Sequence, residues 1–391
     1  MNKNQHIPQG YKDSPLGIIP EDWEVKRLGE VCTHFKSGNT ITSKSIYEEG
    51  LYAVYGGNGL RGYTNTFTHD GNYILIGRQG ALCGNINYIE GKNYITEHAI
   101  AVQTNENTQW LKYKLEHWNL NRFAESSAQP GLSVEKLVRY KLSIPTHQEQ
   151  AKIAEILSLW DTAISKQTAL LDKLTLRKRG LMQQLLTGKK RLKGFEGEWS
   201  YHTIQDHFTE IRDKNDGEGH IPMTISAKLG LISQTHKFDR VVAGNSLDKY
   251  TLLRKGDFAY NKGNSNLYEM GCIYRLKEES AVVPFVYICF RVIDKTCCEF
   301  YQQFFINHGL DKQLKQIITS GARGDGLLNV NSEDFMALKI PYPSIEEQNA
   351  IASILVQADQ EIEIQKQKLS RLQEQKKGLM QVLLTGKKRI K

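Results

Sequence analysis

The stretch Gly180-Leu-Met-Gln-Gln-Leu-Leu-Thr-Gly-Lys-Lys-Arg191 occurs twice in this chain of 391 residues, the second time as Gly378-Leu-Met-Gln-Val-Leu-Leu-Thr-Gly-Lys-Lys-Arg389. The match extends toward the N-terminus. Residues 145–191 align without gaps on residues 343–389, at an offset of 198, and 24 of the 47 positions are identical. Each copy also begins with a similar motif, I-P-x-x-x-E-Q at Ile144 and P-x-x-E-E-Q at Pro343. A repeat at half the chain length indicates a tandem duplication.

The duplication divides the chain into four segments. A weaker similarity supports the division, because Gly17-Ile-Ile-Pro-Glu-Asp-Trp23 near the start has a counterpart in Gly194-Phe-Glu-Gly-Glu-Trp199. Each half then consists of a mixed region followed by a repeated segment. We expect one globular domain over 1–145 and a second over 194–343, with long helices over 146–193 and 344–391.

Both repeated segments carry the start and stop signals of a helix. Thr146 with Glu149, and Ser344 with Glu347, form the S/T-x-x-E pattern of a capping box, in which the two residues satisfy each other's free amides. A glycine that suits a left-handed C-terminal cap follows each segment, at positions 188 and 386. The interval predicts helices of roughly 60 Å at 1.5 Å per residue.

Apolar residues recur along each predicted helix with the 4,3,4,3 spacing of a coiled-coil seam. In the first copy the seam is Ile153, Leu157, Trp160, Ile164, Leu171, Leu174, Leu181 and Leu185. In the second copy it is Ile351, Leu355, Ala358, Ile362, Leu369, Leu372, Leu379 and Leu383. Two seam positions are polar in both copies, Gln167 with Gln365 and Lys178 with Lys376.

A single helix with this seam needs a partner surface. One interpretation packs each helix on its own globular domain. The other packs the two helices on each other, and the intervening domain lets the chain return to make them antiparallel. In that arrangement Gln167 and Gln365 meet near the crossing point and fix the register. Gly180 and Gly378, which cost about 1 kcal/mol relative to alanine inside a helix, then indicate a close backbone approach or a slight bend.

The two mixed regions predict an α+β fold. Residues 73–77, 99–102, 140–144, 257–260 and 338–340 have the character of strands, and residues 110–119 and 300–316 that of helices. Glycine and asparagine are concentrated in residues 55–63, 77–80 and 84–88 of the first region, and in 257–266 and 320–326 of the second. Such stretches form turns and loops between strands.

The composition is that of a globular protein, with 40% hydrophobic and 24% charged residues. The longest apolar run, 281–290, is too short for a membrane span and contains Pro284. The first residues lack the apolar core of a signal peptide. The six cysteines show no paired spacing, which argues against a disulfide framework or a zinc site and favours a reducing cytoplasm.

Sequence motifs of catalysis are missing. The chain contains no phosphate-binding loop, no Asn-Pro-Pro-aromatic tetrapeptide of adenine methyltransferases, no H-E-x-x-H and no G-x-S-x-G. This favours a binding protein. Two competing interpretations are a coiled-coil scaffold without a DNA role and a self-sufficient nuclease or methylase, and the missing motifs argue against the latter.

Together, the duplicated halves and the two repeated motifs resemble the DNA-specificity (S) subunit of type I restriction-modification systems. The resemblance covers essentially the whole chain and implies a pseudo-twofold protein in which two target-recognition domains each read one half of a split, asymmetric double-stranded DNA target. The antiparallel helices would set the unread spacer and dock two methyltransferase (M) subunits. Restriction (R) subunits would join that core. S-adenosylmethionine, ATP and Mg would act in those partners, and no catalytic residue, cofactor or metal is expected in this chain.

Within the recognition loops, the side chains suited to base or phosphate contact are arginine, lysine, asparagine and glutamine, since arginine pairs well with guanine and the amides with adenine. Tyrosine can stack or touch a phosphate. The alternative is that these residues serve the turns themselves. The candidates are Arg61, Tyr63, Arg78, Gln79, Asn85 and Asn87 in the first domain, and Lys262, Asn264, Asn266 and Arg323 in the second.

The formal net charge of +8 is located mainly on the helices. Residues 146–193 hold 10 basic and 4 acidic side chains, and 344–391 hold 9 and 6, whereas 1–145 hold 15 and 14, and 194–343 hold 17 and 19. The globular regions are therefore close to neutral. Because phosphate neutralisation dominates affinity for DNA, we expect the chain alone to bind DNA weakly.

Overall fold

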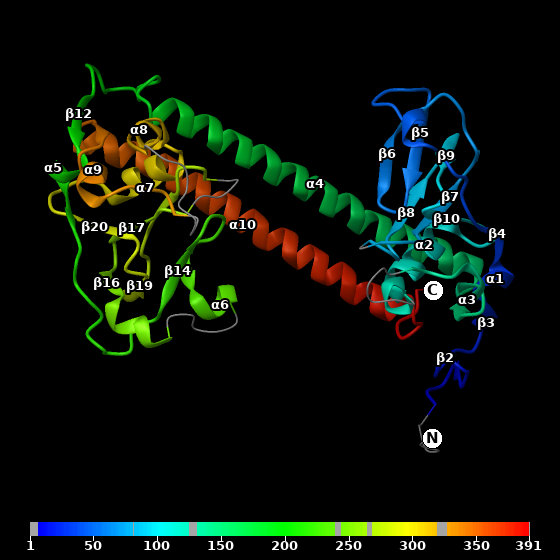
Figure 1. The fold of residues 1–391 in the computed structure, drawn as a ribbon. Helices are drawn as coiled ribbons and strands as arrows, with labels where there is room; N and C mark the ends of the chain where they lie inside the picture. The colour runs from blue at the N-terminus through cyan, green and yellow to red at the C-terminus, as the bar shows by residue number, and fades with distance from the viewer. Residues whose placement is uncertain are drawn as a thin grey trace. The chain divides into compact units, whose positions relative to one another are not determined.

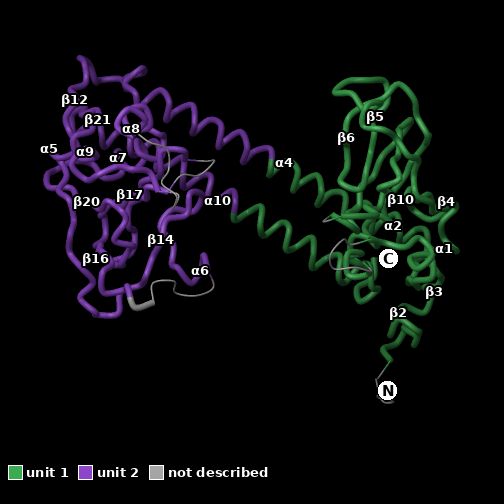
Figure 2. Tube along the Cα trace, viewed as in Figure 1, with its two compact units in different colours: residues 1–168, 367–391 green, residues 169–366 purple. Residues whose placement is uncertain are grey.

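The structure is a computed structural model of the full chain, and it describes residues 7–80, 82–124, 131–238, 244–263, 268–318 and 327–390. The chain divides into two compact units (Figure 2). Unit 1 contains residues 1–168 and 367–391, and unit 2 contains residues 169–366. Each unit therefore combines one globular region with part of both long helices, a different division from the four predicted segments.

Two helices of 39 residues dominate the chain, α4 (His147–Leu185) and α10 (Ile345–Leu383) (Figure 1). Both predicted long helices are confirmed, although they end before 193 and 391. Gly188 and Gly386 follow them with φ of 69° and 74°, the left-handed conformation expected of a C-terminal glycine.

The helices pair antiparallel, as the seam predicted. In unit 1 the start of α4 shares a core with the end of α10, and in unit 2 the end of α4 shares a core with the start of α10. Each of these cores also includes the globular region, so both proposed packing arrangements occur together. The unit 1 core joins Leu157 and Leu383 to Trp110, and the unit 2 core joins Leu185 and Leu355 to Phe300.

Unit 1 is built around a four-stranded antiparallel sheet in the order β4 (Cys32–Ser37), β10 (Ala99–Thr104), β7 (Tyr73–Gly77), β8 (Ile86–Ile89). A three-stranded sheet lies beside it, in the order β6 (Gly59–Thr64), β5 (Tyr52–Gly56), β9 (Asn93–Ile95). The remaining elements are β1 (Tyr11–Lys12) with β2 (Ile19–Pro20), β3 (Glu24–Arg27) with β11 (Lys141–Ile144), and helices α1 (Leu28–Val31), α2 (Thr108–Trp118) and α3 (Val134–Leu137).

Unit 2 repeats the four-stranded sheet in the same order: β13 (Phe208–Glu210), β20 (Ile288–Val292), β17 (Phe258–Asn261), β18 (Cys272–Arg275). The smaller strands differ from those of unit 1. They pair as β14 (Met223–Ser226) with β15 (Gly230–Ser233), β16 (Thr251–Arg254) with β19 (Ser280–Val283), and β12 (Ser200–Thr203) with β21 (Lys339–Tyr342). The helices are α5 (Ile204–His207), α6 (Gln234–Phe238), α7 (Cys298–Ile306), α8 (Asp311–Ile317) and α9 (Ser332–Met336).

The α+β class is therefore confirmed for both globular regions, and the strands predicted from the sequence all form. One helix prediction was wrong. Residues 300–316 do not make one helix, because α7 ends at Ile306 and α8 begins at Asp311. Between them His308 adopts a positive φ of 61°, and Gly309 packs so closely on Phe304 that a Cβ there would lie 2.4 Å from the ring. Such a turn cannot continue a right-handed helix.

No helix in the described part of the chain is long and apolar enough to cross a membrane.

Candidate nucleic-acid interface

The glycine-rich loops of unit 1 come together at one end of its sheets. A Cβ on Gly57 would lie 2.7 Å from the carbonyl oxygen of His98, 3.3 Å from Cα of Gly77 and 3.5 Å from the backbone nitrogen of Arg78. Only a residue without a side chain lets the β5–β6 turn approach the end of β7 this closely. The loops that the sequence predicted to be functional therefore form one surface.

Arg61 and Asn87 flank this turn. Arg61 is exposed on β6, and its side chain crosses Gly56, where a Cβ would lie 2.8 Å from Cδ of the arginine. Asn87 is on β8, and its Oδ1 lies 3.8 Å from the Cβ position of Gly59. Nδ2 of Asn87 is buried and makes no hydrogen bond to any described residue.

Arg78 directly follows β7 and is held by its backbone. Its N–H donates to the carbonyl of His98 (2.9 Å), and its carbonyl accepts from the N–H of Leu132 (2.9 Å). The next residue, Gln79, bridges to Gly131. These bonds fix the main chain at both sides of Arg78 and leave its side chain partly exposed.

The other two candidates of unit 1 have mainly backbone roles. Tyr63 forms a pair of backbone hydrogen bonds with Tyr47 (2.8 and 2.9 Å). Asn85 is exposed, and its carbonyl accepts from the N–H of Gly77 (2.8 Å). Nothing in these contacts places either side chain on a nucleic acid, so their assignment stays a prediction.

In unit 2, Lys262 occupies the position that Arg78 has in unit 1. It directly follows β17, the third strand of the matching sheet, and its carbonyl accepts from the N–H of Leu328 (2.9 Å). The next residue, Gly263, bridges to Leu327 just as Gln79 bridges to Gly131. The two cations thus share the bond at the carbonyl and the adjacent bridge, although the surrounding sequences differ and Nζ of Lys262 also donates to the carbonyl of Val330 (3.3 Å). Asn264, Asn266 and Arg323 lie outside the described residues.

The sequence did not reveal three residues that border the unit 1 loops. Nδ1 of His98 lies 3.4 Å from Oε1 of Gln79, and its Nε2 lies 3.4 Å from Oε1 of Glu97. Oγ1 of Thr96 and Oε2 of Glu97 are buried without a hydrogen bond to the described residues. A histidine flanked by a glutamine and a carboxylate presents donors and acceptors of the kind that base edges recognise. No local motif marks these residues, because only the β5–β9 pairing brings them to the loops.

Away from the loops, the repeated motifs explain how each unit holds its helices. Glu149, at the head of α4, is buried and accepts from Nε1 of Trp23 (2.8 Å) and from Nε of Arg389 (2.8 Å). In unit 2, Glu347 accepts from Trp199 (3.0 Å) and from Arg191 (2.7 Å). The C-terminal end of one repeat therefore binds the N-terminal end of the other. The tryptophan that completes each cluster is the last residue of the weaker similarity between residues 17–23 and 194–199. These bonds raise the pKa of Arg389 above its ordinary range.

The capping boxes are only half confirmed. The N–H of Glu149 donates to Oγ1 of Thr146 (3.3 Å), and that of Glu347 donates to Oγ of Ser344 (3.3 Å). The glutamate side chains, however, bind the tryptophan and arginine instead of the cap. Arginine, unlike the backbone amide of the cap, also supplies the opposite charge that a buried carboxylate needs.

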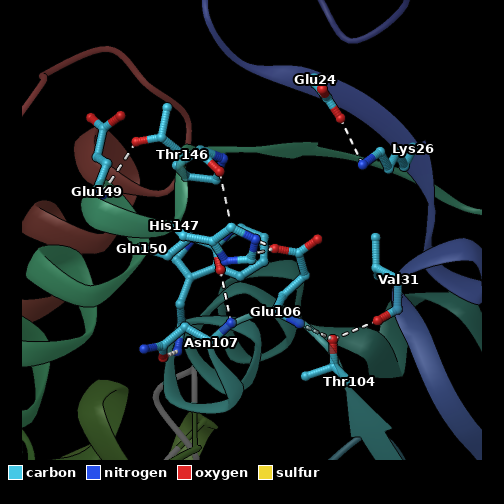
Figure 3. Close-up of polar contacts among 12 residues, drawn as sticks. Glu24, Lys26, Val31, Thr104, Glu106, Asn107, Thr146, His147, Glu149 and Gln150 are labelled. Atoms are coloured by element: carbon cyan, nitrogen blue, oxygen red, sulfur yellow. Dashed lines mark hydrogen bonds and ion pairs between the residues drawn. The ribbon is translucent and has the colours of Figure 1, made fainter.

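The glutamine that follows each glutamate connects the helix to the globular region, as Figure 3 shows for Gln150 of unit 1. Oε1 of Gln150 accepts from the N–H of Asn107 at the start of α2 (2.9 Å), and its Nε2 donates to Glu106 (2.7 Å) and to the carbonyl of Pro145 (3.0 Å). Gln348 bonds in the same way to Cys297 (3.0 Å) and Pro343 (2.9 Å) in unit 2.

The polar seam positions differ in what they contact. Lys376 donates to Asp161 (2.5 Å) in unit 1, and Lys178 donates to Asp359 (2.6 Å) in unit 2. Burial raises the pKa of Asp161, but its bonds to Lys376 and Tyr113 outweigh this and hold the pKa below its ordinary value. Gln167 and Gln365 belong to different units, and their pairing stays a prediction.

The sequence left two explanations for Gly180 and Gly378, and the close backbone approach is not borne out, whereas the slight bend stays a prediction. A Cβ at either glycine would find no described atom of the chain within 4 Å.

Comparison with known proteins identifies a family for this fold. The sequence profile of the type I restriction modification DNA specificity domain matches residues 20–176 and 251–374. The EcoprrI specificity subunit of Escherichia coli is 42% identical over 170 residues, which are 41% of this chain and 42% of that protein, so the match spans less than half of either. The putative MjaX specificity subunit of Methanocaldococcus jannaschii is 24% identical and is matched over 98% of this chain and 97% of its own length.

Solved structures of the same fold exist. The S subunit of a type I restriction-modification system from M. genitalium has a TM-score of 0.60 at 16% identity, covering 92% of this chain and 96% of that one. A chain from a study of the assembly and conformational transition of the type I R-M system has a TM-score of 0.55 at 13% identity, covering 94% and 99%.

Proposed function

The chain belongs to the type I restriction-modification DNA specificity family, and from this premise we propose that each unit reads one half of a bipartite, asymmetric duplex target. The chain itself performs no catalysis in this account. Two methyltransferase subunits, which hold S-adenosylmethionine, dock on the helices, and restriction subunits, which use ATP and Mg, complete the assembly.

The observation that carries the proposal is the equivalence of Arg78 and Lys262. Two sheets of the same strand order each place a cation after the third strand, with the same two backbone restraints. Arginine can bond to both acceptors of a guanine edge, and lysine can contact guanine or phosphate. Different cations in matching positions suit two half-sites of different sequence.

The long helices suit the role of a spacer. A helix of 39 residues is roughly 58 Å long at 1.5 Å per residue, and half-sites read from one side of a duplex are about 34 Å apart. The tail-to-head bonds of Glu149 with Arg389 and of Glu347 with Arg191 fix each helix end to its own unit. The helix length then sets the unread interval.

The charge distribution supports a need for partners. Because residues 1–145 and 194–343 are nearly neutral, few phosphates can be neutralised by the recognition regions, and phosphate neutralisation dominates affinity. We therefore propose that the chain binds duplex DNA weakly alone and tightly with the methyltransferase subunits.

Methylation-sensitive sequencing of DNA from cells that express the chain with its methyltransferase tests this function. The expected motif has two read halves separated by an unread spacer, and it is lost when the chain is deleted. A continuous motif would contradict the bipartite mechanism. A motif that persists without the chain would favour the coiled-coil scaffold.

The spacer can be tested separately. Inserting four residues, about one helical turn or roughly 6 Å, after Thr168 in α4 and after Lys366 in α10 should lengthen the unread interval and leave both half-sites unchanged. The two insertions together preserve the helix pairing, whereas either alone should abolish methylation. An unchanged spacer in the double insertion variant would show that the helices do not set it.

A further inference from the structure

One lysine of unit 1 is buried, and no carboxylate of the described residues pairs with it. Lys114 on α2 is 4% exposed, and its Nζ donates to the carbonyl of Leu384 (2.6 Å) and to Oγ of Ser143 (3.1 Å). Both of these acceptors are neutral, and a buried charge without an opposite charge is unfavourable. Burial accordingly lowers the pKa of Lys114 to about 7. The lysine thus needs an explanation.

The C-terminal end of the long helix does not require a lysine at this position, as the comparison with unit 2 shows. Tyr113 donates to Asp161 and Gln303 donates to Asp359, at the same place in each unit. The residue after Gln303 is Phe304, which packs in the same core as Leu186, the counterpart of Leu384. Unit 2 therefore closes the end of α4 with an apolar ring, where unit 1 places an ammonium group at the end of α10.

Lys114 lines a cavity of about 860 Å³ in unit 1. Three more basic residues line the same cavity, and none of the described residues that line it is acidic: the four are Lys114, His117, Lys141 and Lys387. In unit 2, Thr187 is the counterpart of Thr385 and lines a smaller cavity of about 320 Å³. The lining of that cavity includes a carboxylate, Glu198, beside Arg191.

The electrostatics of this cavity favour an anion. The C-terminus of α10 contributes a partial negative charge of about half a unit, which cannot balance three lysines. Burial and the nearby Lys114 together lower the pKa of His117, as expected where positive charge is in excess. Tyr11, on β1, is the other titratable side chain among the described residues that line the cavity.

The shape and lining narrow the choice of anion. A volume of about 860 Å³ is within the range of small-molecule sites. Trp118 and Ile19 line it beside the lysines and provide apolar surface. An inorganic ion alone would leave that apolar surface uncovered. A phosphate attached to a larger planar group would contact both the basic side chains and the apolar surface.

We propose that this cavity binds a small phosphate-bearing ligand, with the phosphate beside Lys114, Lys141 and Lys387 and the remainder against Trp118. The site goes beyond the reading of DNA and is independent of it, because it involves none of the loop residues around Gly57. It gives unit 1 a binding site for a small anion beside the end of α10.

Calorimetric titration of the full chain at pH 7 with inorganic phosphate and with adenosine monophosphate tests the site. We expect both to bind, the nucleotide more tightly, with uptake of protons that is seen as a dependence of the heat on the buffer. Proton uptake follows because an anion raises the pKa values of Lys114 and His117. Lys141→Ala and Lys387→Ala should each weaken binding about tenfold, the equivalent of one charge-assisted bond.

Lys141 and Lys387 are exposed, so their variants should fold even if Lys114→Met does not. Lys44→Ala, at an exposed lysine of unit 1 that does not line the cavity, is the matched control and should leave phosphate binding unchanged. Absence of binding by both probes overturns the proposal. The proposal is also overturned if the Lys141 and Lys387 variants bind a short DNA duplex more weakly but bind both small probes as before. The cavity would then contact the DNA backbone.

Discussion

Units 1 and 2 agree where the helices are held and differ where DNA is proposed to be read. The agreement is residue by residue, since tryptophan, glutamate and arginine form the same cluster in both units, as Trp23, Glu149 and Arg389 or as Trp199, Glu347 and Arg191. The difference is in the smaller strands and loops around one common sheet. The duplication therefore preserved the attachment of the helices, whereas the smaller strands and the loops diverged.

The largest effect is expected when the arginine of one tryptophan–glutamate–arginine cluster is replaced at a time. Arg389→Met leaves the buried Glu149 carboxylate with neutral donors, Nε1 of Trp23 and the N–H of Ile390 (3.4 Å). We expect a loss of about 3 kcal/mol in the free energy of unfolding, the scale for a buried charge that has lost its ionic partner. Arg191→Met should cause a loss of the same order in unit 2. Urea denaturation of both variants measures this.

Equal losses would support the equivalence of the two clusters. If Arg389→Met unfolds the chain while Arg191→Met is neutral, the clusters are not equivalent, and unit 1 alone depends on its chain ends. Lys388, the exposed neighbour of Arg389, provides the control as Lys388→Met, which should change stability little.

A smaller effect should distinguish the units, because the free energy of unfolding of unit 1 should depend on pH through Lys114. Because the pKa of Lys114 is lowered from 10.5 to about 7, the unfolded chain retains a proton between these pH values that the folded chain has released. Stability therefore rises with pH across this window, by at most about 1.4 kcal/mol per pH unit. Lys114→Met should remove this rise. The measurement is urea denaturation at pH 7, 8 and 9.

Unit 2 has Phe304 in the same place and should contribute no such rise. Hydrogen exchange followed at these pH values, corrected for the intrinsic rate, can assign the effect to unit 1. A rise that persists in Lys114→Met would mean that another group causes it.

The smallest expected effects are at the two helix glycines, where the units should respond alike. No described atom lies within 4 Å of a Cβ at Gly180 or Gly378, so alanine fits without strain. Gly180→Ala and Gly378→Ala should each stabilise the chain by up to about 1 kcal/mol. Thermal unfolding of the isolated chain measures the gain, and destabilisation by either substitution would reveal a packing contact that this account lacks.

The sequence predicted the helices and their pairing because a repeat and a 4,3,4,3 spacing are local signals. It could not predict that Glu149 binds Trp23 and Arg389, which are 126 and 240 residues away, and it assigned that glutamate to its own cap. The break at His308 was missed for a related reason. The amino-acid sequence does not indicate that this histidine adopts a positive φ, and the segments on both sides of it have the sequence character of helices.

The sequence could propose candidate recognition residues by their chemical class, but it could not give their arrangement in space. Glycine-rich loops with arginine, lysine and amide side chains indicated Arg78 and Lys262 separately. Their equivalence appears only when the two sheets are compared, because no shared motif surrounds them. His98 became a candidate only through the pairing of β5 with β9, which places the segment after β9 beside the loops.

The central claim is that each unit reads its own half of the target, and the methylated motifs of Arg78→Ala and Lys262→Ala test it most directly. Each variant is expressed with the methyltransferase, and its motif is determined by methylation-sensitive sequencing. We predict that Arg78→Ala relaxes one half of the motif and Lys262→Ala the other, each by about 1 to 3 kcal/mol of discrimination at the affected base pair. Changes in the same half, or no change in either variant, would contradict the claim.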